Sequence, residues 1–113
     1  MTIGSDNGRL GDRIPAFFYK PRVGLQVATA IGSDKNSYFN IKPAPPSGQW
    51  SSVVVSQLKT GSTTTFSVKI NDAAPLTREN PAPRAFSFVK VFASDPWFKG
   101  QPGSIRGLTI KTQ

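Results

Sequence analysis

The chain has 113 residues, the usual size of a single domain and enough to bury a core of its own. It contains no cysteine and no histidine, which excludes disulfides, thiolate and imidazole metal ligands, and Ser-His or cysteine nucleophile systems. Fourteen Lys and Arg residues against six acidic residues give a formal charge of +8, which attracts polyanions such as nucleic acid or sulfated glycans. We therefore expect a binding protein with no catalytic residues, no metal and no cofactor.

The N-terminal part of the chain is predicted to form short strands. Residues 1–13 are rich in Gly, Asp and Asn and are expected to be a flexible lead-in to one domain over residues 14–113. Strand-like runs, none with a helical period, follow at residues 17–19, 25–31 and 38–41. Residues 43–48 then form a turn-rich connection, because proline withholds a backbone donor and glycine supplies positive φ.

The middle of the chain predicts a hairpin. Trp50 begins a fourth run, which is rich in valine, and its side chain is expected to lie in the core. Residues 59–62 (KTGS) indicate the turn into a fifth strand. In that strand Phe66, Val68 and Ile70 alternate with polar residues, which predicts one buried face and one wet face.

The last third of the chain predicts two more strands. Prolines keep the dozen residues after Asp72 irregular. A sixth run at residues 85–93 has apolar side chains on both faces, which is typical of a central strand or of a strand whose second face meets a partner. A seventh run covers residues 105–112. About seven strands without an amphipathic helix indicate an all-β antiparallel sandwich or barrel.

Four blocks in the second half of the chain occur in a distinctive order. They are QWSSVVV at residues 49–55, FSVKIN at 66–71, VKVFASDPWF at 89–98 and GSIRGL at 103–108. This order resembles the concanavalin A-like jelly roll of laminin-G-type modules, especially the variant of secreted and matrix proteins of invertebrates and fishes that ends in a similar strand pair. Farnesoic-acid-methyltransferase-like domains are similar too. The resemblance covers a little over half of the chain, and the SDPWF turn is its most specific part.

The resemblance implies an antiparallel β-sandwich of the jelly-roll, concanavalin A-like type. It also implies a secreted, extracellular recognition module for glycans or protein partners, as in cell adhesion or the extracellular matrix. It transfers no particular ligand, because ligands vary widely on this fold. Many family members are longer, carry disulfides and sometimes bind calcium through acidic loops; a chain with six acidic residues does not favour a calcium site.

Two other functions stay open. One is a basic β-barrel that binds single-stranded nucleic acid, with aromatic side chains stacking on bases and cations neutralising phosphates. The other is a structural, self-assembling matrix component without a soluble ligand. For the recognition module itself, self-association as a homo-oligomer is expected to use the aromatic strand at residues 86–92. Insertion into a membrane is not expected, since no stretch approaches the roughly 20 apolar residues of a membrane span.

The SDPWF turn supplies the first candidate binding residues. Trp97 is a candidate platform on which a sugar ring would stack through its apolar C–H face, or else a plug at the end of the sandwich. Asp95 would accept hydrogen bonds from the ligand, or would bond backbone donors of its own turn.

The loop at residues 77–84 supplies the second candidate set. It gathers two guanidinium groups, a carboxylate and an amide, so Arg78, Asn80 and Arg84 are predicted to form a polar binding rim. The alternative is an ordinary solvated loop. Shared exposure of Trp97 and this loop on one concave surface would favour a ligand site.

Overall fold

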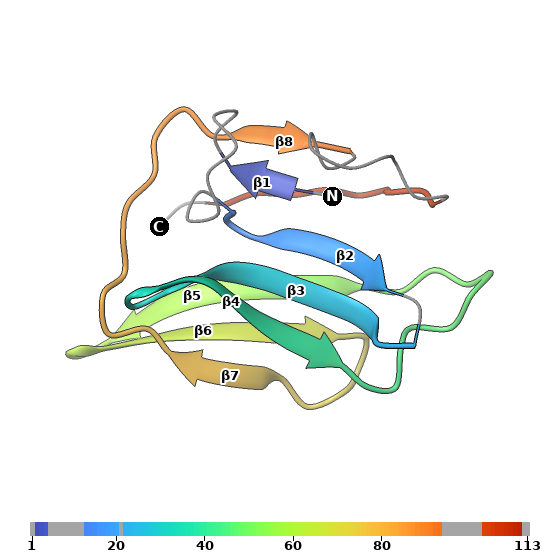
Figure 1. Ribbon diagram of the computed structural model, residues 1–113, viewed down its shortest axis with the longest axis horizontal. Helices are drawn as coiled ribbons and strands as arrows, with labels where there is room; N and C mark the ends of the chain where they lie inside the picture. The colour runs from blue at the N-terminus through green and yellow to red at the C-terminus, as the bar shows by residue number, and fades with distance from the viewer. Residues whose placement is uncertain (1, 5–12, 21, 94–102, 112–113) are drawn as a thin grey trace.

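The structure, a computed structural model, describes residues 2–4, 13–20, 22–93 and 103–111. Within these residues all regular structure is β-strand, and all strand pairing is antiparallel (Figure 1). No helix in the described part of the chain is long and apolar enough to cross a membrane. The predicted all-β antiparallel class is therefore confirmed.

The strands form two sheets. The five-stranded sheet has the order β4-β3-β2-β1-β8 and the three-stranded sheet the order β5-β6-β7. The members of the first are β1 (Thr2–Gly4), β2 (Ala16–Lys20), β3 (Gly24–Ile31), β4 (Asp34–Ile41) and β8 (Lys90–Phe92). The members of the second are β5 (Val53–Thr60), β6 (Thr63–Ile70) and β7 (Leu76–Glu79).

The β5–β6 hairpin forms where the sequence predicts it. Thr60 pairs with Thr63 across a two-residue turn in which Gly61 has a φ of 62°, a conformation that glycine adopts at little cost. In β6 the alternation is also confirmed, because Phe66 and Val68 are buried while Lys69 is exposed. A period of two residues thus turns one face of this strand toward the other sheet.

The core lies between the two sheets and gives the molecule a β-sandwich-like architecture. Its buried side chains come from both layers: Val27, Ile31, Phe39, Ile41, Phe66 and Val68. The rings of Phe39 and Phe66 meet across the layers with centroids 5.4 Å apart. Such tilted aromatic pairs stabilise by about 1 kcal/mol beyond their buried area. This contact joins β4 of the five-stranded sheet to β6 of the three-stranded sheet.

Two strands occur in segments where the sequence pattern predicts none. Residues 2–4, within the predicted lead-in, form β1, which pairs with β2 on one side and β8 on the other. β7 lies in the segment expected to be irregular and pairs with β6 over four residues. Both strands are short, so a run of alternating side chains is too brief to be recognised in sequence.

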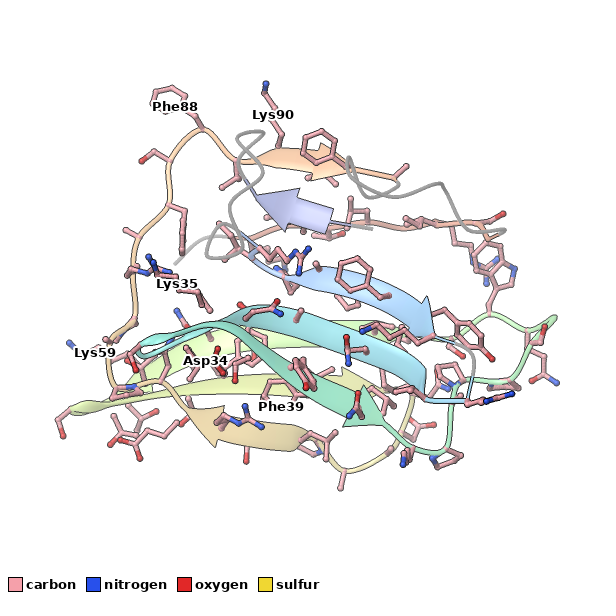
Figure 2. All side chains as sticks on the ribbon, viewed as in Figure 1. Asp34, Lys35, Phe39, Lys59, Phe88 and Lys90 are labelled. Atoms are coloured by element: carbon pink, nitrogen blue, oxygen red, sulfur yellow. The ribbon has the colours of Figure 1, made fainter. Side chains whose placement is uncertain are left out.

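The two apolar runs of the C-terminal third form less strand than predicted. Only Lys90–Phe92 of the sixth run is a strand, and Phe88 has a positive φ and is 99% exposed (Figure 2). The described part of the seventh run, residues 105–111, contains no strand.

Trp50 is 54% exposed, so the prediction that it lies in the core is wrong. The guanidinium carbon of Arg106 lies 4.1 Å from the centroid of the Trp50 ring, a cation–π contact formed at the surface.

Candidate ligand-binding face

The predicted site residues are not gathered into one exposed site within the described residues. Trp97 and Asp95 lie outside the described residues, so their roles stay predictions. Arg78, from β7, points toward the other sheet: its guanidinium donates a hydrogen bond to Ser37 Oγ and lies 4.7 Å from the centroid of the Phe39 ring. This arginine therefore joins β7 of the three-stranded sheet to β4 of the five-stranded sheet.

Asn80 is an anchor inside the chain. It is 4% exposed, and its Oδ1 accepts hydrogen bonds from the backbone N–H groups of Gly32 at 2.9 Å and Ala82 at 3.3 Å. Its Nδ2 donates to Gln57 Oε1 at 2.7 Å, and its own N–H donates to the carbonyl of Thr64 at 2.7 Å. One asparagine thus links the β3–β4 turn to the β5–β6 hairpin.

Arg84 lies beyond this anchor. Its guanidinium carbon is 5.3 Å from the centroid of the Phe86 ring, again as a cation–π pair. The three rim residues therefore have three different environments: a contact between sheets, a buried anchor and a loop contact. Whether any of them also touches a ligand stays a prediction.

A different set of polar and aromatic side chains does converge on one surface. Because Val27 and Phe39 face the core, their neighbours along β3 and β4 face outward. Two rows of residues on this side of the sheet cross strands β2, β3 and β4. One row is Phe18, Gln26 and Asn40, and the next is Ala16, Ala28 and Tyr38. Gln26, Ala16 and Ala28 are buried, so the exposed members of the rows are Tyr38 and Asn40 on β4. We call Arg13, Phe18, Gln26, Asn36, Tyr38 and Asn40 the outer amide–aromatic face.

Hydrogen bonds fix the amides of this face. Gln26 Nε2 donates to Asn40 Oδ1 at 3.0 Å between directly paired residues of β3 and β4. The amide NH2 of Asn40 has no partner among the described residues, and Asn40 is exposed. Two donors of one exposed side chain are thus held in a defined direction and available to a ligand.

Aromatic rings flank the amides. Tyr38 lies two residues before Asn40 on the same face of β4 and is 50% exposed. Phe18 lies in the row across the sheet and carries the guanidinium of Arg13, whose Cζ is 5.1 Å from the ring centroid. Arg13 Nη1 also donates to Asn36 Oδ1 at 3.0 Å. The cation is therefore fixed by stacking on one strand and by a hydrogen bond to another.

No group of three or more acidic, cysteine or histidine side chains gathers in the part of the chain that the structure describes. An exposed phenol ring with a fixed amide nearby offers an apolar face for stacking and hydrogen-bond donors beside it.

Sequence reasoning missed this face, although a signal exists. Gln26 and Asn40 are polar residues inside two strand-like runs, and each stands at an outward position of its alternation. The spacing of Tyr38 and Asn40 places both on one side of a strand. Sequence does not give the pairing of Gln26 with Asn40, because that depends on the register of the β3–β4 hairpin.

No protein-family profile matches the chain, and neither a curated protein nor a solved structure matches it. The resemblance to laminin-G-type modules therefore rests on the residue blocks of the C-terminal half alone.

Proposed function

We propose that the chain is a non-catalytic, extracellular recognition module that binds a glycan on the outer amide–aromatic face. The observation that carries this proposal is the exposed Tyr38 ring beside the fixed amide of Asn40. A pyranose ring stacks its C–H face on Tyr38, and its hydroxyl groups accept hydrogen bonds from the Asn40 amide. The site lies on paired strands, which hold a binding geometry better than loops do.

The same proposal includes a jelly-roll fold for the β-sandwich. A jelly roll of the concanavalin A-like, laminin-G type is supported by the two antiparallel layers and by the four residue blocks, of which the SDPWF turn is the most specific part. Secreted matrix and adhesion proteins use such modules to bind sugars and other proteins, and the proposed glycan site and location agree with that use.

The test is a glycan array followed by calorimetric titration of the best ligand. We expect Tyr38→Ala to weaken that binding about tenfold, because a lost stacking contact is worth about 1.4 kcal/mol. The matched control is Tyr19→Ala, which removes an equally exposed tyrosine (53%) from the opposite face of the same sheet. Its affinity should equal that of the wild type.

Two results would overturn the proposal. One is an array without any bound glycan, and the other is unchanged affinity in Tyr38→Ala. The charge of +8 also makes single-stranded oligonucleotides a necessary comparison. Oligonucleotide binding that falls steeply with salt, in the absence of glycan binding, would instead support the nucleic-acid function.

A further inference from the structure

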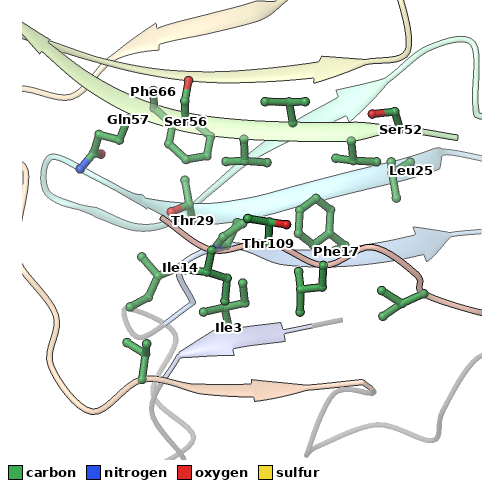
Figure 3. Close-up of a pocket in the computed structure, with 18 of the residues that line it drawn as sticks. Ile3, Ile14, Phe17, Leu25, Thr29, Ser52, Ser56, Gln57, Phe66 and Thr109 are labelled. Atoms are coloured by element: carbon green, nitrogen blue, oxygen red, sulfur yellow. The ribbon is translucent and has the colours of Figure 1, made fainter. Parts of the chain in front are cut away.

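An open cleft lies between the two sheets, and Phe66 of the Phe39–Phe66 contact is among the residues that line it. Its volume is about 2070 Å3, and it is lined by the inner face of the five-stranded sheet, by β5 and by residues 103–111. Figure 3 shows Ile3 and Phe17 on one side of this space and Gln57 on the other. In the part of the chain that the structure describes, the second sheet has three strands opposite five. Residues 103–111, which form no strand, line the cleft together with the inner face of β1 and β2, where Ile3 is buried.

The edge of β5 borders this cleft and offers free backbone groups. Asn71 N–H donates to the carbonyl of Ser52 at 2.9 Å, which identifies that pair as a hydrogen-bonded pair of the β5–β6 ladder. Alternation then directs the N–H and C=O groups of Val54 and Ser56 toward β6. Those of Val53, Val55, Gln57 and Lys59 point away from β6, and no described segment pairs with them.

The edge strands β7 and β4 have a protection that β5 lacks. The charged side chain of Arg78, on β7, contacts Ser37 and Phe39 on β4, so it bridges these edges of the two sheets. Inward-pointing charges and very short strands are common ways of blocking an edge. β8 has three residues, whereas β5 has eight, of which Lys59 is the only charged one. Among the described residues, β5 is thus open to pairing along its length.

The charge of the cleft selects among possible occupants. Lys20, Arg84, Arg106 and Lys111 line it, and no acidic residue belongs to its described lining. A second copy of this chain carries the same formal charge of +8, so its approach is opposed by repulsion. An occupant with carboxylates is favoured.

We propose that β5 and this cleft bind an extended segment of a partner protein, in which acidic residues alternate with apolar ones. The segment adds to the three-stranded sheet as a fourth strand beside β5. Its backbone pairs with the free groups of Val53, Val55 and Gln57. Because side chains alternate along a strand, its carboxylates point into the cleft toward the cations of the lining, while its apolar side chains lie beside the exposed Val54 and Leu58 on the other face of β5. This surface is separate from the outer amide–aromatic face.

Amide hydrogen exchange measured by NMR tests the proposal. The probe is an acetylated, amidated eight-residue peptide of sequence EVEVTVEV, and the matched control peptide is KVKVTVKV. We expect the acidic peptide to slow exchange of the Val53, Val55 and Gln57 amides at least about tenfold, because each becomes hydrogen-bonded. The Val54 and Ser56 amides, already paired with β6, should change little. The basic peptide should protect none of them.

Two variants sharpen the test. Val53→Pro removes one outward N–H at the first residue of the strand, where proline is tolerated, and should weaken peptide binding about tenfold while the thermal midpoint stays near that of the wild type. Arg106→Gln should reduce the preference for the acidic peptide, whereas Lys69→Gln, on the exposed face of β6 outside the cleft, should not.

Four outcomes would overturn the inference. They are unchanged exchange of the three amides with either peptide, equal protection by both peptides, and a dimer by sedimentation that already protects these amides without peptide. The fourth is dodecanoate filling the cleft in the absence of any peptide effect, which would identify a lipid-like occupant. Because Tyr38→Ala should leave peptide binding unchanged, failure of this inference is distinguishable from failure of the glycan proposal.

Discussion

Replacing Asn80 by alanine tests the account of this residue as an anchor. The side chain makes three hydrogen bonds, to the backbone of Gly32 and Ala82 and to the side chain of Gln57. It connects two hairpins that lie in different sheets. In Asn80→Ala all three bonds are lost.

The expected loss follows from the burial of the partners. Gln57 is exposed, so its freed oxygen can turn to water at little cost, whereas Gly32 N–H is partly buried and stays unsatisfied. One unsatisfied backbone donor with partial loss of the other bonds costs about 2 kcal/mol. For a domain of this size that corresponds to a lowering of the thermal midpoint by about 8 °C.

Guanidinium denaturation followed by far-UV circular dichroism measures the effect. The matched control is Gln57→Ala, which removes one of the same bonds from the other side and should cost about 1 kcal/mol, because the Nδ2 of the buried Asn80 loses its acceptor. In a double-mutant cycle, the two changes should show a coupling of about 1 kcal/mol, since each removes the Asn80–Gln57 bond. A destabilisation below about 0.5 kcal/mol in Asn80→Ala would refute the reasoning.

Two further substitutions test the core and one turn. Phe66→Ala removes a buried ring that packs on Phe39 and should cost about 4 kcal/mol in the same denaturation assay; a loss below about 1.5 kcal/mol would mean that the sheets do not pack as described. Gly24→Ala should cost about 2 kcal/mol or more, because Gly24 has a φ of +93° and an added Cβ would lie 2.9 Å from the Cβ of Ala44. Gly61→Ala, also at positive φ but with nothing within 4 Å, should cost only about 1 kcal/mol; equal effects of the two would contradict the steric argument.

The strands predicted correctly have enough residues for their alternation to be recognised. Both β3 and β6 occur where expected. In β6 the expected face is buried, whereas β3 has buried residues on both faces, such as Val27 and Ala28. The turn between β5 and β6 was equally clear, since a glycine between two such runs indicates a hairpin.

The C-terminal half illustrates the opposite case. Its apolar runs satisfy a strand pattern, yet pairing needs a neighbouring strand with free backbone groups in register, and that neighbour is chosen by the whole fold. The described residues 103–111 instead line the cleft without pairing. Trp50 likewise belongs to an apolar run, but it lies before the first paired residue of β5 and remains at the surface beside Arg106.

The candidate site divides in the same way. Composition alone excluded cysteine and histidine chemistry, and the strand periods alone determined an all-β protein, because both depend on residue type and spacing along the chain. Only the tertiary structure decided that Gln26 and Asn40 pair beside Tyr38, that Asn80 is buried, and that β5 keeps an open edge. These features arise from register and sheet order, which depend on contacts between residues far apart in sequence.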